Sequence, residues 1–241
     1  MAAQRLESTN AESFYVSAIH DLEAAGVPFM IGGAYAMRVY AGIERDTKDL
    51  DIFCKAGDYP RILEALAERG YTTEVTDGNW LAKAFCNEHF VDVIFNSRNG
   101  LCPVDDTWLE HARGGKILDV DVKLIPAEEE LWTKLYVQDR YRFDGADVNH
   151  IIRHMGTELD WQRILMRMEV HWELLLQALI YFRFVYPSEV EKIPEWLMTE
   201  LLDRMRRQIA VPASKDAICR GPALSQHQYD PDISQWGYKT R

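Results

Sequence analysis

Two aspartates one residue apart, Asp49 and Asp51, are the strongest chemical signal in the sequence. Asp49 precedes Leu50, and Asp51 lies between Leu50 and the apolar pair Ile52 and Phe53. An apolar run of this kind is typical of a buried strand. Successive side chains of a strand point to opposite faces, so the two aspartates project the same way. Carboxylates that share a buried face repel each other and lose hydration, and a cation compensates both costs. Hard carboxylate oxygens suit Mg²⁺, so the pair predicts a divalent-metal site.

A glycine pair lies shortly before these acids. Gly32 and Gly33 follow the short apolar run of residues 29–31 and precede a helical pattern, so we expect them on a strand-to-helix turn. Backbone N–H groups at such a helix start, helped by the helix dipole, can approach phosphate oxygens. The glycine turn and the aspartate pair together indicate phosphate chemistry.

The elements that must position these residues change character near Pro126. Before it, short strands alternate with helices; after it, the apolar spacing is helical. The pattern predicts an α+β domain over residues 1–126, a helical domain over 127–210 and a C-terminal tail over 211–241, whose aromatic residues favour packing back on the chain. The predicted strands are 29–31, 48–54, 80–85, 90–95, 117–120 and 122–125. The predicted helices are 11–25, 33–41, 59–69, 128–140, 148–155, 161–186 and 194–209.

Composition sets broad limits on function. The 241 residues carry a net charge of −11, which argues against a protein that grips nucleic acid mainly by electrostatics. The four cysteines show no metal-binding spacing, so neither a zinc site nor a disulfide framework is expected. There is no apolar stretch of membrane-spanning length and no signal peptide, so we expect a soluble, cytoplasmic protein without a membrane partner.

The glycine pair, the stretch from Arg45 to Asp51, and Asp92 within the later strand 90–95 resemble the nucleotidyltransferase superfamily typified by DNA polymerase β. Within it, the chain is similar to bacterial type IV (abortive-infection) toxin-like and antibiotic nucleotidyltransferases. The resemblance is strong over about residues 27–95. A weaker part covers residues 132–151, where four residues resemble the second conserved block of the toxins: Lys134, Arg140, Asp144 and Asp147.

The resemblance implies a mixed sheet with flanking helices, followed by a helical domain. It implies that Asp49, Asp51 and Asp92 hold two Mg²⁺ (or Mn²⁺) ions, with Asp92 as the base that activates the acceptor hydroxyl. A nucleoside triphosphate (NTP) such as ATP is the implied donor. The residues implied to bind it are Gly32, Gly33, Arg45 and Asp144.

Lys134 is expected to contribute to catalysis from the helical domain. Helical spacing places it beside Leu131 and Leu135, so its ammonium is expected to emerge at the edge of the domain junction and neutralise charge on the leaving pyrophosphate. Two simpler interpretations stay open: Lys134 is a solvated surface lysine, and Asp144 and Asp147 are only the N-cap and first-turn acid of the next helix.

These observations predict metal-dependent transfer of a nucleoside monophosphate from an NTP to an acceptor hydroxyl, with release of pyrophosphate. The alternatives are a catalytically silent nucleotide- or partner-binding module and, less favoured, a glycosyltransferase that uses the two aspartates on a nucleotide sugar. Three acids favour catalysis, and the short step from Gly33 to Asp49 favours nucleotidyl transfer. The acceptor stays open among small molecules, tRNA and proteins, because one fold serves many substrates. A toxin-like role with an antitoxin or regulatory partner also stays open.

Overall fold

The computed structural model describes the backbone of residues 2–240 and the side chains of residues 11–240. It divides into two compact units, Met1–Pro126 and Ala127–Arg241, here called the sheet unit and the helical unit. Residues 1 and 241, at the ends of the predicted first domain and tail, lie outside the described residues. None of the described helices is long and apolar enough to cross a membrane.

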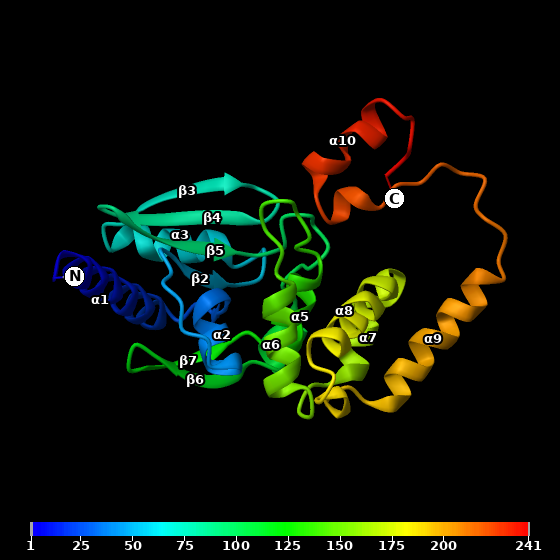
Figure 1. Ribbon diagram of the computed structural model, residues 1–241. Coiled ribbons are helices and arrows are strands. Elements are labelled where there is room, and N and C mark those ends of the chain that lie inside the picture. The colour runs from blue at the N-terminus through cyan, green and yellow to red at the C-terminus, as the bar shows by residue number, and fades with distance from the viewer. Residues whose placement is uncertain (1, 241) are drawn as a thin grey trace. The chain divides into compact units, whose positions relative to one another are not determined.

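The sheet unit is built on one mixed seven-stranded sheet in the order β3-β4-β5-β2-β1-β7-β6 (Figure 1). Two neighbouring pairs, β2 with β5 and β1 with β7, are parallel, and the others are antiparallel. This confirms the expected mixed sheet. The strands are β1 Met30–Ile31, β2 Leu50–Phe53, β3 Thr72–Asp77, β4 Leu81–Cys86, β5 His89–Ile94, β6 Arg113–Ile117 and β7 Val120–Leu124.

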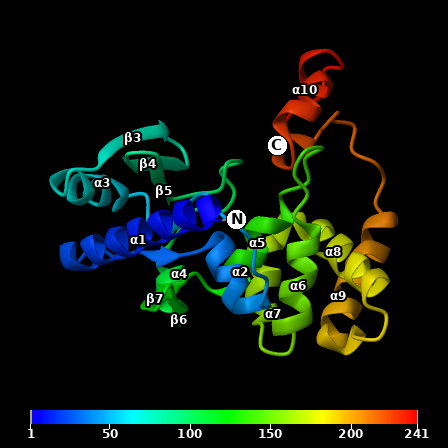
Figure 2. The same ribbon diagram turned by 60° about the vertical axis from the view of Figure 1, so that its left-hand side comes forward.

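Helices flank this sheet. Among them, α1 contacts α3 and β5, whereas α2 contacts β2 and β6 (Figure 2). Apolar side chains fill the interior of the unit: Leu50, Ile52, Val91 and Val93 are all fully buried. The helices are α1 Ala2–Ala25, α2 Gly33–Ala41, α3 Tyr59–Glu68 and α4 Asp106–Glu110.

Helix α2 has the boundaries that its glycines predict. It begins after the N-cap residue Gly32 and ends at Gly42, whose left-handed backbone (φ 64°) lets its N–H donate to the carbonyl of Arg38 at 3.0 Å. At the other end of the helix, Gly33 also has a positive φ of 58°. The glycine pair therefore does form the strand-to-helix turn between β1 and α2.

The helical unit contains α5 to α10, and its C-terminal segment packs on it. The Ser225 hydroxyl donates to the Asp139 carboxylate, and the backbone N–H of Arg140 donates to Gln228 Oε1 at 2.7 Å. The helices are α5 Ala127–Leu135, α6 Gly145–Met155, α7 Trp161–Met168, α8 Trp172–Val185, α9 Glu195–Ile209 and α10 Gln226–Ser234, with short 3₁₀ turns at Glu169–His171, Val190–Lys192 and Gly221–Ala223.

Three predicted elements were wrong. Residues 117–120 are not a strand, because Leu118 and Asp119 have positive φ values of 47° and 64° and form the turn between β6 and β7. The single helix predicted over 161–186 is broken at Glu169, whose backbone (φ 3°, ψ −81°) leaves the helical region. The helix predicted to reach residue 140 ends at Leu135.

Candidate active site

The three aspartates expected to bind metal converge on one face of the sheet unit. Asp49 lies immediately before β2, Asp51 lies within β2, and Asp92 lies on the neighbouring parallel strand β5 directly opposite Asp51. Each offers a carboxylate oxygen, and the three oxygens lie within 4.8 Å of one another. All three side chains are partly buried, so their charges are only partly screened by water.

Each carboxylate has a different neighbour. The Thr47 hydroxyl donates to Asp49 Oδ1 at 2.7 Å. The backbone of Gly33 lies so close to Asp51 that a Cβ there would be 1.7 Å from Asp51 Oδ2. Lys83 Nζ donates to Asp92 Oδ1 at 2.5 Å. The N-terminus of α2 therefore lies against the acid cluster, and a lysine ammonium contacts its third member.

Burial dominates the electrostatics of Asp92. The loss of hydration raises the pKa of its carboxyl above the ordinary value, the ammonium of Lys83 opposes that rise, and the charge of Asp49 adds to it. A carboxylate with a raised pKa accepts a proton more readily, which is the property that a general base needs.

Tyr15 of α1 is a further buried group beside the acids. Its side chain is 1% exposed, and its hydroxyl has no hydrogen-bond partner among the described residues. Its pKa is raised chiefly by burial, then by Tyr35 and by the negative charges of the three aspartates. The phenol is therefore expected to stay protonated in this environment.

The other expected site residues are distributed differently. The backbone N–H of Gly32 donates to the Asp51 carbonyl at 3.0 Å, which ties the glycine turn to β2. Arg45 lies in the loop between α2 and β2 with its side chain exposed. Lys134 and Asp144 belong to the helical unit, where Lys134 Nζ donates to Asp144 Oδ2 at 3.2 Å. The nucleotide contacts of Arg45 and Asp144 stay predictions.

The Lys134 ammonium is buried among acids of its own unit, and its expected place at the edge of the domain junction stays a prediction. The side chain is only 6% exposed, and Nζ lies 2.8 Å from Asp147 Oδ2, 3.2 Å from Asp144 Oδ2 and 3.4 Å from Glu130 Oε1. These three carboxylates on α5, at the start of α6 and within α6 draw the ammonium inward. The simpler interpretation of a solvated lysine is therefore wrong, and the role on pyrophosphate stays a prediction.

Sequence reasoning missed Lys83. Its partner can be read only from strand register: a two-residue turn at Asn87 and Glu88 pairs Cys86 with His89 and, further along the hairpin, Lys83 with Asp92. Asn87 has the positive φ (56°) that such tight turns use. Recognising this hairpin in the sequence would have placed the lysine opposite the aspartate.

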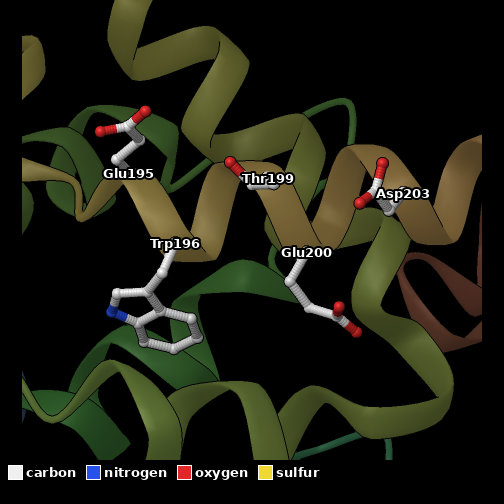
Figure 3. A pocket seen from close by; sticks show the side chains of 5 residues that line it. All are labelled: Glu195, Trp196, Thr199, Glu200 and Asp203. Atoms are coloured by element: carbon white, nitrogen blue, oxygen red, sulfur yellow. The ribbon is translucent and has the colours of Figure 1, made fainter.

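A surface hollow elsewhere in the chain differs chemically from this cluster. It has a volume of about 430 Å³ and lies along α9. In Figure 3, Trp196 and Glu200 point to one side of the helix and the other labelled residues to the opposite side. Three of its five lining residues are acidic, but among the described residues they form no group with the converging ligand oxygens that the three aspartates have. The lining residues are Glu195, Trp196, Thr199, Glu200 and Asp203.

Comparison with known proteins agrees with the geometry. Residues 16–94 match the family model described as aminoglycoside-2''-adenylyltransferase, and this stretch includes all three aspartates. No curated protein sequence matches the chain.

Solved structures with some likeness include three proteins. ANT(2'')-Ia in complex with adenylyl-2''-tobramycin is 17% identical, with 73% of this chain and 98% of that chain covered and a TM-score of 0.46. The lincomycin-bound lincosamide antibiotic adenylyltransferase LnuA is 18% identical (58% and 94% covered, TM-score 0.40). An antigenic nucleotidyltransferase-like protein from Paracoccidioides brasiliensis is 16% identical (77% and 92% covered, TM-score 0.42).

At these TM-scores, the structural likenesses by themselves assign neither a substrate nor an activity. The family match has more weight, because it spans the glycine turn and the three aspartates, Asp49, Asp51 and Asp92. These residues lie together on a mixed sheet with flanking helices. Residues 16–94 therefore match a nucleotidyltransferase family model, and the acid cluster and mixed sheet of this stretch agree with that match.

Proposed function

We propose that this chain catalyses the metal-dependent transfer of a nucleoside monophosphate from an NTP to the hydroxyl of an acceptor, with release of pyrophosphate. The observation that carries the proposal is the convergence of Asp49, Asp51 and Asp92, whose carboxylate oxygens lie within 4.8 Å of one another. Among the described residues, this is the group suited by geometry and donor type to hold metal ions.

The donor set fits Mg²⁺ or Mn²⁺. All three side chains offer carboxylate oxygens, the hard ligands that these ions prefer. Two-metal sites hold their ions about 3.5–4 Å apart, a span that converging carboxylates can serve. Divalent ions held by these residues would offset phosphate charge and lower the pKa of an acceptor hydroxyl.

The chain's own groups divide the remaining work. Asp92 takes the proton from the acceptor hydroxyl as the oxygen forms its bond to the α-phosphorus. The bond from that phosphorus to the pyrophosphate oxygen breaks in the same in-line displacement. The start of α2, next to Asp51, presents backbone N–H groups and the positive end of the helix dipole to the triphosphate.

For the substrates, we propose ATP as donor and a small hydroxyl-bearing molecule as acceptor. The support is the family match, whose description names an adenylyl transfer to an aminoglycoside. Transfer to tRNA or protein, and a toxin-like role with an antitoxin partner, stay predictions.

The test incubates the purified chain with each of the four α-³²P-labelled NTPs and Mg²⁺ or Mn²⁺. Acceptors are a panel of aminoglycosides, lincosamides and other polyols, then tRNA, then cell lysate. Labelled product should form, and Asp51→Asn should abolish it. Asp92→Asn should retain NTP binding and lose roughly 10²–10⁴-fold in rate, the range typical of a lost general base. The matched control is Asp119→Asn, because Asp119 is an exposed turn residue of the same unit.

A catalytically silent nucleotide-binding module is the second candidate. The observation that favours it is the ion pair between Lys83 and Asp92, because an ammonium already neutralises the proposed base. This candidate predicts NTP binding without labelled product under every condition. Unchanged product formation in both Asp51→Asn and Asp92→Asn would instead remove the proposed mechanism.

A further inference from the structure

Lys83 holds a defined position on the acid cluster. It lies on β4, directly opposite Asp92 of β5 in the antiparallel pairing. Its Nζ donates to Asp92 Oδ1 at 2.5 Å, and the two side chains are only 20% and 14% exposed. The same ammonium lies 4.1 Å from the centre of the Phe90 ring. Strand register, a charged hydrogen bond and a cation–π contact thus fix one cation against one carboxylate.

This arrangement bears directly on metal binding. Asp92 is one of the three carboxylates that must turn toward divalent ions under the proposed function. Lys83 compensates the charge of a partly buried aspartate, which is costly to leave alone. A divalent ion would compensate the same charge. An ion that binds Oδ1 of Asp92 would have to displace the ammonium of Lys83 from that oxygen.

We propose that Lys83 is a positioning residue: it acts as the counter-ion of Asp92 in the metal-free enzyme and competes with divalent metal for Asp92 Oδ1. The proposal rests on the proposed function and adds a residue that regulates metal binding at the same site. The metal-free site is held together by Lys83, and its affinity for metal alone is kept low. The ammonium that leaves Asp92 becomes available to the negatively charged triphosphate that arrives with the metal.

The test measures Mn²⁺ binding to the nucleotide-free protein by the electron paramagnetic resonance signal of the free ion. Lys83→Met should tighten Mn²⁺ binding on the order of tenfold, because a charge-assisted hydrogen bond no longer has to be broken. Lys83→Gln should act in the same direction and decides the question if the methionine variant does not fold. Lys83→Arg, which stays cationic, should keep affinity near that of the wild type.

The matched control is Lys48→Met. Lys48 is exposed and adjacent in sequence to Asp49, so its loss makes the same change in net charge near the cluster. A smaller gain in Lys48→Met than in Lys83→Met supports competition at Asp92. Equal affinities in wild type, Lys83→Met and Lys83→Gln overturn the role of Lys83 and leave the metal centre standing. Tighter Mn²⁺ binding without labelled product in any variant overturns the proposed function instead. Absence of Mn²⁺ binding in every variant overturns the competition at Asp92, and the labelled-product assay then decides the proposed function.

Discussion

The carboxylates of the three aspartates are compensated in different ways, and this gives them different tasks. The hydroxyl of Thr47 orients Asp49, and the start of α2 lies against Asp51. Asp92 is paired with an ammonium and has a pKa raised by burial. It is therefore the member of the cluster whose protonation and pairing can change during the reaction.

The hydroxyl of Tyr15 predicts an unusual response to mutation. It is fully buried and has no hydrogen-bond partner among the described residues, so the folded state bears the cost of removing it from water. Tyr15→Phe should raise the free energy of unfolding of the metal-free protein by about 1 kcal/mol, measured by urea denaturation.

Tyr40→Phe is the matched control. The Tyr40 hydroxyl is also buried but donates to the Ile125 carbonyl at 2.6 Å, so its removal leaves that acceptor unpaired. Stability should fall by about 1 kcal/mol in this variant. If Tyr15→Phe loses as much stability as Tyr40→Phe, the Tyr15 hydroxyl is bonded in solution, and the prediction is wrong.

At the scale of elements, the site depends on how β2, β5 and α2 meet. The parallel register between β2 and β5 sets Asp51 beside Asp92. The turn into α2 then brings Gly33 against Asp51, at a distance that leaves no room for a side chain. Close packing of this turn on β2 is what allows the helix N-terminus to act on the same charges as the metal ions.

Gly33→Ala tests this packing. The new Cβ would collide with Asp51 Oδ2, so the carboxylate must turn away, and Mn²⁺ binding and nucleotidyl transfer should both be largely lost. Gly42→Ala at the other end of α2 is the control: φ is also positive (64°), but no heavy atom lies within 4 Å of its Cβ. Both variants should lose about 1 kcal/mol in stability from backbone strain. Equal activity in the two variants would show that the approach to Asp51 is not needed.

The same elements explain what the sequence could and could not predict. Buried strands such as Leu50–Phe53 and His89–Ile94 stand out as apolar runs. Gly42 marks the end of α2 because glycine readily adopts a left-handed backbone. The edge strand Thr72–Asp77 was missed because its side chains are mostly polar and none is buried. The strand Arg113–Ile117 was missed because two glycines interrupt its apolar pattern.

The site was predictable only where the relevant signal is local. Asp49 and Asp51 share a face through strand alternation, which the sequence pattern predicts, whereas the place of Asp92 beside them was implied by the family resemblance. The pairing of Lys83 with Asp92 depends on hairpin register, and the burial of Lys134 depends on carboxylates from a second helix. Local spacing around Lys134 shows its apolar neighbours but not the acids that reach it across the fold.

At the scale of the whole molecule, the helical unit contains a charge network unlike the acid cluster of the sheet unit. Glu128, Glu129 and Glu130 open α5 and are all buried. Arg163 Nη2 lies 2.6 Å from Glu128 Oε2, and Arg167 Nε lies 3.3 Å from Glu129 Oε1. Here each buried acid has a protein cation as partner, whereas the acid cluster brings three carboxylate oxygens within 4.8 Å of one another. Buried acids that are paired with cations maintain the fold, whereas converging carboxylates are suited to hold metal ions.

Lys134 is a cation of this network that contacts three acids, and its removal should lower the stability of the protein. Burial alone would lower the pKa of its ammonium, but Glu130, Asp144 and Asp147 together raise it, so the charge is held firmly. Lys134→Met leaves three buried carboxylates without this partner, a loss of about 3–5 kcal/mol. The Tm should fall on the order of 10 °C by differential scanning calorimetry.

Lys215→Met, at an exposed lysine of the same unit, should leave the Tm unchanged. If Lys134→Met instead keeps its Tm and loses roughly 10²-fold or more in transfer rate, Lys134 acts on the phosphates as the sequence suggested.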